Sequence, residues 1–221
     1  MSTPKELSQL ASTLFLGGSA KYRLMQKYRP YICPYDALIE YVPQGSSMLD
    51  IGCGGGLFLG LLTGTNRIKH GHGFDSSEDA IETAKRMAAE AKTKGYTADL
   101  LFEARSADAE WPDSTYDVVS LIDVMHHVPP PAHQKVINNA IERIKPGGRF
   151  IYKDMCSRPF WMAFANRMHD LVLAKEWINY VNVSDVIEWG TSAGLRVAHQ
   201  SRINQLWYGH ELVVFERPET S

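Results

Sequence analysis

A run of glycines directly after an apolar stretch is the first place in this sequence where chemistry can be expected. Gly52, Gly54, Gly55 and Gly56 follow the apolar stretch that ends at Ile51, and the apolar run "LFLGLL" comes next. Glycines remove side chains where a ligand must approach the main chain closely. At a helix start they also leave N–H groups turned outward, which favours an anion. The stretch predicts a nucleotide-type ligand at the end of a buried strand.

Two familiar kinds of glycine loop do not fit the spacing. A dinucleotide loop has the pattern G-x-G-x-x-G, but its third glycine would fall on Leu57 or Leu59, depending on where the pattern begins. The phosphate loop of nucleotide triphosphatases needs a lysine followed by serine or threonine, and this chain has Leu57-Phe58 there. Neither ligand class is therefore favoured.

Further chemical groups follow later apolar stretches. His126 and His127 come after "YDVVSLIDVM", and an imidazole there is suited to general-base work near neutral pH. Neighbours on a strand point to opposite faces, so one of the two should face a substrate, and we favour His126. Asp123 and Asp154 invite a magnesium interpretation, but no third oxygen ligand follows Asp154. We expect no metal.

The elements that would position these groups alternate along the chain. Periodicity predicts strands at 47–52, 71–77, 99–108, 116–128 and 149–155, with helices near 56–62, 78–95 and 131–148. Such alternation indicates parallel βαβ units, and hence an α/β fold with a doubly wound, mostly parallel sheet. The last two strands, 195–203 and 210–217, are separated by too few residues for a parallel crossover. We therefore expect an antiparallel edge strand.

The composition narrows the class of protein. The net charge is −2 and the pI about 6.4, which does not favour a nucleic-acid partner. Three cysteines without a CxxC pair indicate a reducing, cytoplasmic location. No uncharged apolar stretch approaches the roughly 20 residues of a membrane span. The oligomeric state stays open.

Taken in order, the motifs resemble those of class I S-adenosylmethionine-dependent methyltransferases. The loop reads D-x-G-x-G-x-G from Asp50 to Gly56, and Asp75 closes the second strand. "SADAEWP", "DVMHHV" and "IKPGGRFIYKD" resemble the later signatures of that family. The resemblance runs from about Ser47 to Arg217 and implies the Rossmann-like methyltransferase fold.

The resemblance also implies a set of cofactor contacts. The amino-acid end of S-adenosylmethionine would lie over the loop, where Asp50 would bind its ammonium group or else cap the loop backbone. Asp75 would accept both ribose hydroxyls, and Asp108 with the Ala107 N–H would hold the adenine. The complete expected cofactor set is Asp50, Gly52, Cys53, Gly54, Asp75, Ser76, Ala107, Asp108 and Ile122.

A single domain over residues 1–221 is expected, with 1–44 as an N-terminal helical cap and 156–183 as an inserted substrate-cap segment. The insert is rich in aromatic residues, and tyrosines such as Tyr22 in the N-terminal part can fold over the cofactor. An apolar, aromatic pocket suits a planar or lipophilic small molecule.

We therefore expect an enzyme that methylates a small, aromatic or lipophilic molecule. The chain lacks the Asn/Asp-Pro-Pro-Tyr turn that methyltransferases of nucleic-acid bases often carry after the fourth strand. Two alternatives stay open: methylation of a protein side chain, and a catalytically silent subunit that binds S-adenosylmethionine for regulation.

Overall fold

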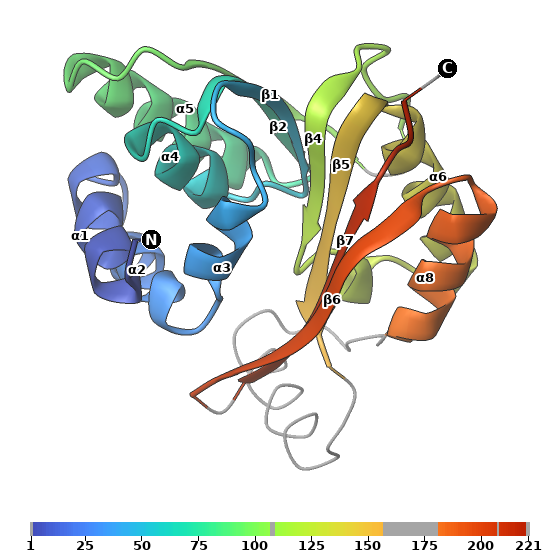
Figure 1. Cartoon of the computed structure of the whole chain (residues 1–221). Coiled ribbons are helices and arrows are strands. Elements are labelled where there is room, and N and C mark those ends of the chain that lie inside the picture. The colour runs from blue at the N-terminus through green and yellow to red at the C-terminus, as the bar shows by residue number, and fades with distance from the viewer. Residues whose placement is uncertain (1, 107–108, 157–180, 207, 220–221) are drawn as a thin grey trace. The chain divides into compact units, whose positions relative to one another are not determined.

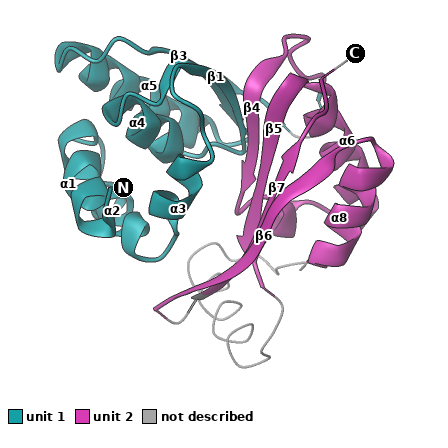
Figure 2. Ribbon diagram, in the orientation of Figure 1, with its two compact units in different colours: residues 1–109 teal, residues 110–221 magenta. Residues whose placement is uncertain are grey.

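The computed structural model describes residues 2–106, 109–156, 181–206 and 208–219 (Figure 1). By their internal contacts these residues fall into two compact units, Met1–Ala109 and Glu110–Ser221, coloured teal and magenta in Figure 2. Each unit is built around its own set of strands. The expectation of a single domain over 1–221 stays a prediction.

The first unit contains three parallel strands in the order β3-β2-β1. These are β1 (Ser46–Ile51), β2 (Ile68–Asp75) and β3 (Asp99–Ala104). Two crossover helices, α4 (Leu57–Gly64) and α5 (Glu78–Thr93), join them. Most residues of β1 and α4 are buried, because both carry continuous apolar runs. These are the βαβ units that the alternation predicts.

The first compact unit begins with helices that precede β1 in the sequence. They are α1 (Pro4–Leu14), α2 (Ala20–Tyr28) and α3 (Tyr35–Glu40), with the 3-10 helix η1 (Arg29–Tyr31) before α3. Helix α1 starts with a capping box between Thr3 and Glu6. It buries Leu7, Ala11 and Leu14, which recur at helical spacing, and it packs against α4 (Figure 1). The N-terminal part is therefore anchored in the core of the first unit.

The second unit contains four strands in the order β4-β5-β7-β6. They are β4 (Tyr116–Ile122), β5 (Ile144–Met155), β6 (Arg196–Gln205) and β7 (Tyr208–Glu216). Strands β4 and β5 are parallel, whereas β7 is antiparallel to both β5 and β6. Helices α6 (His133–Glu142) and α8 (Val183–Ser192) pack on one another and on these strands. The mostly parallel sheet with an antiparallel edge is confirmed.

Several expected boundaries are wrong, and the ends of β4 and α6 differ most. Strand β4 ends at Ile122 rather than at residue 128, because Asp123 adopts a left-handed φ of 57°. The chain then forms the 3-10 helix η2 (Met125–His127), and a second one, η3 (Pro130–Ala132), precedes α6. The strand alternation that we used to choose between the two histidines therefore does not apply to them.

The second wrong boundary lies at the end of α6. Ile144, which falls inside the helix expected near 131–148, instead opens β5 and pairs with Tyr116. The register then shifts before Arg149 pairs with Val118, and Gly147 has a φ of 74° in between. Most of the expected insert 156–183 falls outside the described residues. Within the described part of the chain, no helix has the length and apolar character needed to cross a membrane.

The register shift predicts a stability defect for Gly148→Ala. A Cβ at Gly148 would lie 2.8 Å from the Lys145 carbonyl oxygen and 2.9 Å from that of Asp117. Backbone atoms cannot move aside cheaply, so we expect a loss of about 1–3 kcal/mol in the free energy of unfolding, measured by urea denaturation.

Gly17→Ala is the matched control, because its Cβ would only contact Arg86 at 3.8 Å. Equal unfolding midpoints for the two variants would contradict the crowding described at Gly148.

Candidate cofactor and active site

The end of β2 holds the glycine loop. The N–H groups of Gly52 and Cys53 donate to the carbonyl oxygen of Phe74, at 2.8 and 3.0 Å. The N–H group of Gly54 donates to Oδ2 of Asp75 at 2.9 Å. The first three N–H groups of the loop are thus used inside the protein. The first turn of α4, which follows, has no side-chain cap, so its N–H groups retain the anion-favouring potential expected from the sequence.

Alternate glycines of the loop need the left-handed backbone. Gly52, Gly54 and Gly56 have φ values of 68°, 53° and 77°. A Cβ at Gly54 would meet nothing within 4 Å, so this side of the loop is open to a ligand. A Cβ at Gly56 would instead lie 2.9 Å from the Phe102 ring, which packs against the loop. The absence of a side chain at Gly54 therefore allows a ligand to approach the loop, and its absence at Gly56 allows the Phe102 ring to pack against the loop.

Asp75 can serve the loop and a ligand together. Its Oδ2 accepts from Gly54, and its Oδ1 accepts from the Ser77 N–H at 2.9 Å, next to the start of α5. An ionised carboxylate can accept about four hydrogen bonds, so capacity remains for two hydroxyl groups. The side chain is half-buried, and the neighbouring Ser76 is exposed. This geometry fits the ribose contact that the sequence predicts.

The side chains of Asp50 and Cys53 are both buried. Asp50 lies near the end of β1, in register with Gly73 of β2. Burial raises the pKa of the Cys53 thiol well above its usual value, and the negative charges of Asp50 and Asp75 add to the shift. The thiol stays protonated, so Cys53 acts as a small packing residue and not as a nucleophile.

Tyr22 of α2 reaches the glycine loop from the N-terminal part of the chain. A Cβ at Gly55 would overlap the Tyr22 hydroxyl oxygen, so the two residues are in direct contact. Burial raises the pKa of Tyr22, while the charge of Arg29 and a hydrogen bond with Gln26 act in the opposite direction. One of the tyrosines expected to fold over the cofactor thus lies against the loop.

The second unit pairs His126 with Asp154. Nδ1 of His126 lies 2.5 Å from Oδ1 of Asp154, and both side chains are buried. The carboxylate also accepts the backbone N–H groups of His126 and Met155, at 3.2 and 2.7 Å. In this contact Nδ1 is the His126 nitrogen that can donate to a carboxylate oxygen. The contact holds the His126 ring in one orientation.

His127 differs from its neighbour in burial. Its side chain is exposed, whereas His126 is only 3% exposed. The two ring centroids lie 4.1 Å apart with an interplanar angle of 48°. Ile122, the last residue of β4, is buried just before this turn.

Asp123, the other carboxylate of the magnesium alternative, also has a basic neighbour. Nζ of Lys153 lies 2.5 Å from Oδ1 of Asp123, and the Lys153 side chain is fully buried. Among the residues that the structure describes, no three His, Cys, Asp or Glu side chains gather into a potential metal site. The two aspartates considered as ligands are thus each engaged by a basic side chain.

Sequence reasoning missed the roles of Lys153 and Asp154 as partners of Asp123 and His126. The signal was the charged pair Lys153-Asp154 directly after the apolar residues 150–152, because buried charges need partners. Ala107 and Asp108, the expected adenine contacts, lie outside the described residues.

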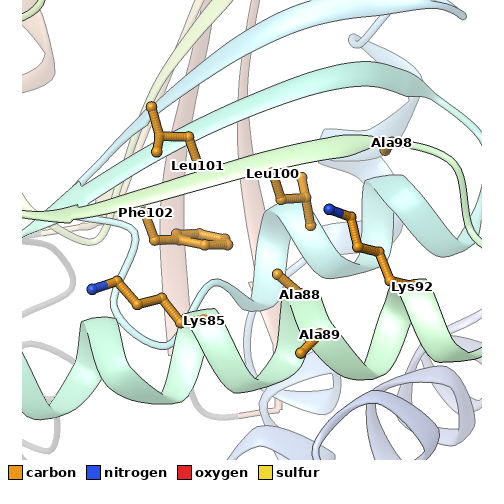
Figure 3. A pocket seen from close by; sticks show the side chains of 8 residues that line it. All are labelled: Lys85, Ala88, Ala89, Lys92, Ala98, Leu100, Leu101 and Phe102. Carbon is orange, nitrogen blue, oxygen red and sulfur yellow. The ribbon is translucent and has the colours of Figure 1, made fainter.

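A separate groove of about 310 Å³ lies between α5 and β3 (Figure 3). Leu100 and Phe102 point toward the helix, and Lys85 and Lys92 stand on the helix beside them (Figure 3). No carboxylate lines this groove, so it does not offer the ribose contact. Its lining residues are Lys85, Ala88, Ala89, Lys92, Ala98, Leu100, Leu101 and Phe102.

Comparison with known proteins identifies relatives of this chain. A family model described as a methyltransferase domain matches residues 25–200. A ubiquinone biosynthesis O-methyltransferase of Coxiella burnetii (strain Dugway 5J108-111) is 27% identical over 173 residues, covering 72% of this chain and 69% of that protein.

Solved structures are similar over nearly the whole chain. Magnesium protoporphyrin IX methyltransferase from Synechocystis PCC 6803, solved with bound SAH, gives a TM-score of 0.67 at 16% identity, over 95% of this chain and 93% of that one. A Haloferax volcanii protein solved with the Trm112 methyltransferase activator gives a TM-score of 0.70 at 21% identity. The match covers 99% of this chain and 100% of that one. These likenesses show the fold.

The chain belongs to the methyltransferase-domain family. With its glycine loop and strand-end motifs it is a class I S-adenosylmethionine-dependent methyltransferase, and S-adenosylmethionine is its cofactor. The open side of Gly54 and the remaining acceptor capacity of Asp75 fit that cofactor.

The Asp75 contacts predict that Asp75→Ala weakens S-adenosylmethionine binding. Each hydrogen bond to a charged acceptor is worth about 1.5–3 kcal/mol, so we expect a loss of about tenfold to over a hundredfold in affinity by titration calorimetry. Asp79→Ala, which removes an exposed carboxylate from the first turn of α5, should bind as the wild type does. Wild-type affinity of the Asp75 variant would reject the ribose assignment.

Proposed function

We propose that this methyltransferase methylates a hydroxyl group of a small aromatic or lipophilic molecule, with His126 as the general base. The observation that carries the proposal is the buried contact of His126 with Asp154. A hydroxyl acceptor is further supported by similarity to proteins named ubiquinone biosynthesis O-methyltransferases, whose printed name indicates a lipophilic acceptor. His127, whose ring lies beside that of His126, is the second candidate for the base.

The cofactor, when bound, supplies a methyl group on a positively charged sulfur, which is already activated for displacement. The chain contributes alignment of the acceptor oxygen and exclusion of water. His126 would take the proton of the acceptor O–H as the acceptor oxygen receives that methyl group, and the rest of the cofactor would leave as a neutral thioether.

Asp154 is proposed as the positioning residue for this step. Its carboxylate holds the Nδ1–H of His126, so the proton of the acceptor would be taken at Nε2. The same negative charge favours the imidazolium that forms, as an opposite charge at close range does. Burial of both side chains strengthens this effect, because water screens the pair poorly there.

The fold supports the assignment of the remaining residues. In doubly wound sheets, ligands bind beyond the carboxyl ends of the strands. Asp75 ends β2, Ile122 ends β4, and Asp154 lies one residue before the end of β5. We assign Asp50, Gly52, Cys53, Gly54, Asp75, Ser76, Ala107, Asp108 and Ile122 to the cofactor, as the motifs imply.

The cysteines and the net charge support a proposal for the compartment and partners of the enzyme. The three cysteines are free and buried, which suits a reducing, cytoplasmic compartment. The net charge of −2 gives no support to a nucleic-acid partner. Residues 1–44 and 156–183 are proposed as the two parts that cover the cofactor and the acceptor.

His126→Asn is the variant that tests the base. Asparagine can still donate to Asp154, so the buried carboxylate keeps a partner, but it cannot take a proton. We expect turnover to fall by roughly 10²–10⁴-fold, with the affinity for S-adenosylmethionine nearly unchanged. His127→Asn is assayed beside it, because His127 is the exposed neighbour on the same turn and the second candidate for the base. A loss of turnover in the His127 variant alone would assign the base to His127.

Asp154→Asn tests the positioning role. We expect the acid limb of the turnover–pH profile to move to lower pH, because the carboxylate that favours imidazolium is gone. A merely structural role would change stability without moving that limb.

Wild-type turnover in both the His126 and His127 variants would show that alignment alone is sufficient, and would remove the base from the proposal.

Labelled S-adenosylmethionine tests the acceptor class. We expect transfer to phenols and catechols, and weaker or no transfer to the matching anilines. We also expect full activity after addition of EDTA, because Asp123 and Asp154 already have basic partners. Label in proteins of an extract would instead favour the protein substrate, and cofactor binding without any product would favour the silent subunit. Loss of turnover on chelation that magnesium restores would make the two aspartates ligands.

A further inference from the structure

Helix α2 turns an apolar face outward. Leu24, Met25 and Tyr28 are 57%, 43% and 51% exposed, and Leu16, just before the helix, is 52% exposed. Residues 24, 25 and 28 share one helical face, a spacing that ordinarily packs against a core. Exposed apolar residues gathered in this way mark an interaction site more often than scattered ones do.

Positive charge surrounds this face. Lys21, Arg23 and Lys27 are all exposed on the same helix. The sequence contains no aspartate or glutamate between Glu6 and Asp36, so no carboxylate near in sequence offsets them. Since the whole chain carries a net charge of −2, the cationic character is local to this helix.

The opposite face of α2 is already committed to the protein. Tyr22 lies against the glycine loop at Gly55, and Gln26 is only 2% exposed. The helix cannot rotate to bury its apolar face without withdrawing both. In addition, the Arg23 guanidinium donates to the Leu16 carbonyl oxygen at 3.2 Å, which ties the preceding segment to the helix. The apolar face is therefore held outward.

We propose that this face docks the enzyme on an anionic phospholipid bilayer. The docking face consists of Lys21, Arg23, Leu24, Met25, Lys27 and Tyr28. Its leucine and methionine enter the boundary between headgroups and acyl chains, while the cations contact lipid phosphates. Tyr28 has the amphipathic ring that is favoured at such interfaces, and Lys27 Nζ lies 5.6 Å from its centroid.

A bilayer fits this face better than other occupants do. A second copy joined by two-fold symmetry would place the same cations opposite one another, which is repulsive. The face offers amines, a guanidinium and apolar side chains, with no carboxylate to fix the register of a folded protein partner. The choice of a membrane also rests on the proposed function, because a lipophilic acceptor dissolves in the bilayer.

Vesicle co-sedimentation of the full chain tests this docking. Vesicles of phosphatidylcholine alone are compared with vesicles that also contain phosphatidylglycerol. Binding to the anionic vesicles is expected, and it should weaken as salt is raised. Lys21→Glu/Lys27→Glu should weaken it by at least about 25-fold, at roughly fivefold for each cation removed. Leu24→Ser/Met25→Ser should also reduce binding.

Lys85→Glu/Lys92→Glu on α5 is the matched control, because it makes the same charge change at two exposed lysines of another helix. Wild-type binding of this control, with unchanged unfolding midpoints for all variants, supports docking through α2. Equal losses in both double variants, equal binding to the two vesicle types, or no binding at all would overturn it.

Two further outcomes distinguish membrane docking from self-association and from the proposed function. Self-association that Leu24→Ser/Met25→Ser abolishes, without vesicle binding, would assign the face to a second copy and overturn the proposal. Vesicle binding without transfer to any hydroxyl acceptor would leave the docking face standing while the proposed function fails. The readout is sedimentation and does not depend on activity.

Discussion

The attachment of the glycine loop to the end of β2 is the constraint on which the candidate cofactor site depends. The Phe74 carbonyl and the Asp75 carboxylate together accept three successive N–H groups of the loop. This requires that β2 runs parallel to β1 and reaches as far, as the pairing of Ile51 with Phe74 shows. The crossover through α4 supplies that geometry. The loop, the strand end and the crossover helix therefore form one unit of structure.

In the second unit, charged side chains lie buried at the end of a strand and need partners. Lys153 and Asp154 are successive residues of β5, and neighbours on a strand point to opposite faces. Each finds a partner in the segment after β4, Asp123 for the lysine and His126 for the aspartate. Removing one member of such a pair leaves an uncompensated buried charge, which is strongly destabilising. The turn after β4 is thus specified by the strand beside it.

Much of the fold could be predicted because its signals are local. The glycine spacing, the alternation of apolar runs and the short turn between the last strands each depend on a few neighbouring residues. The environment of His126 could not be predicted in the same way, because its partner Asp154 is distant in sequence and meets it only through the β4–β5 register. The left-handed Asp123 also ended the strand earlier than its apolar pattern indicates. The ribose contact expected of Asp75, by contrast, could be proposed from the sequence, because it depends only on the position of this residue at the end of the second strand.

The contact between Tyr22 and Gly55 links two distant parts of the sequence through steric fit. A larger residue at position 55 needs the space that the tyrosine hydroxyl occupies, so the Tyr22 side chain has to shift when position 55 is enlarged. In the evolution of this lineage, enlargement at position 55 requires shortening or displacement at position 22. Substitutions at these two sites should therefore be inherited as pairs, and a recombinant that joins the helix of one homologue to the loop of another inherits a mismatch.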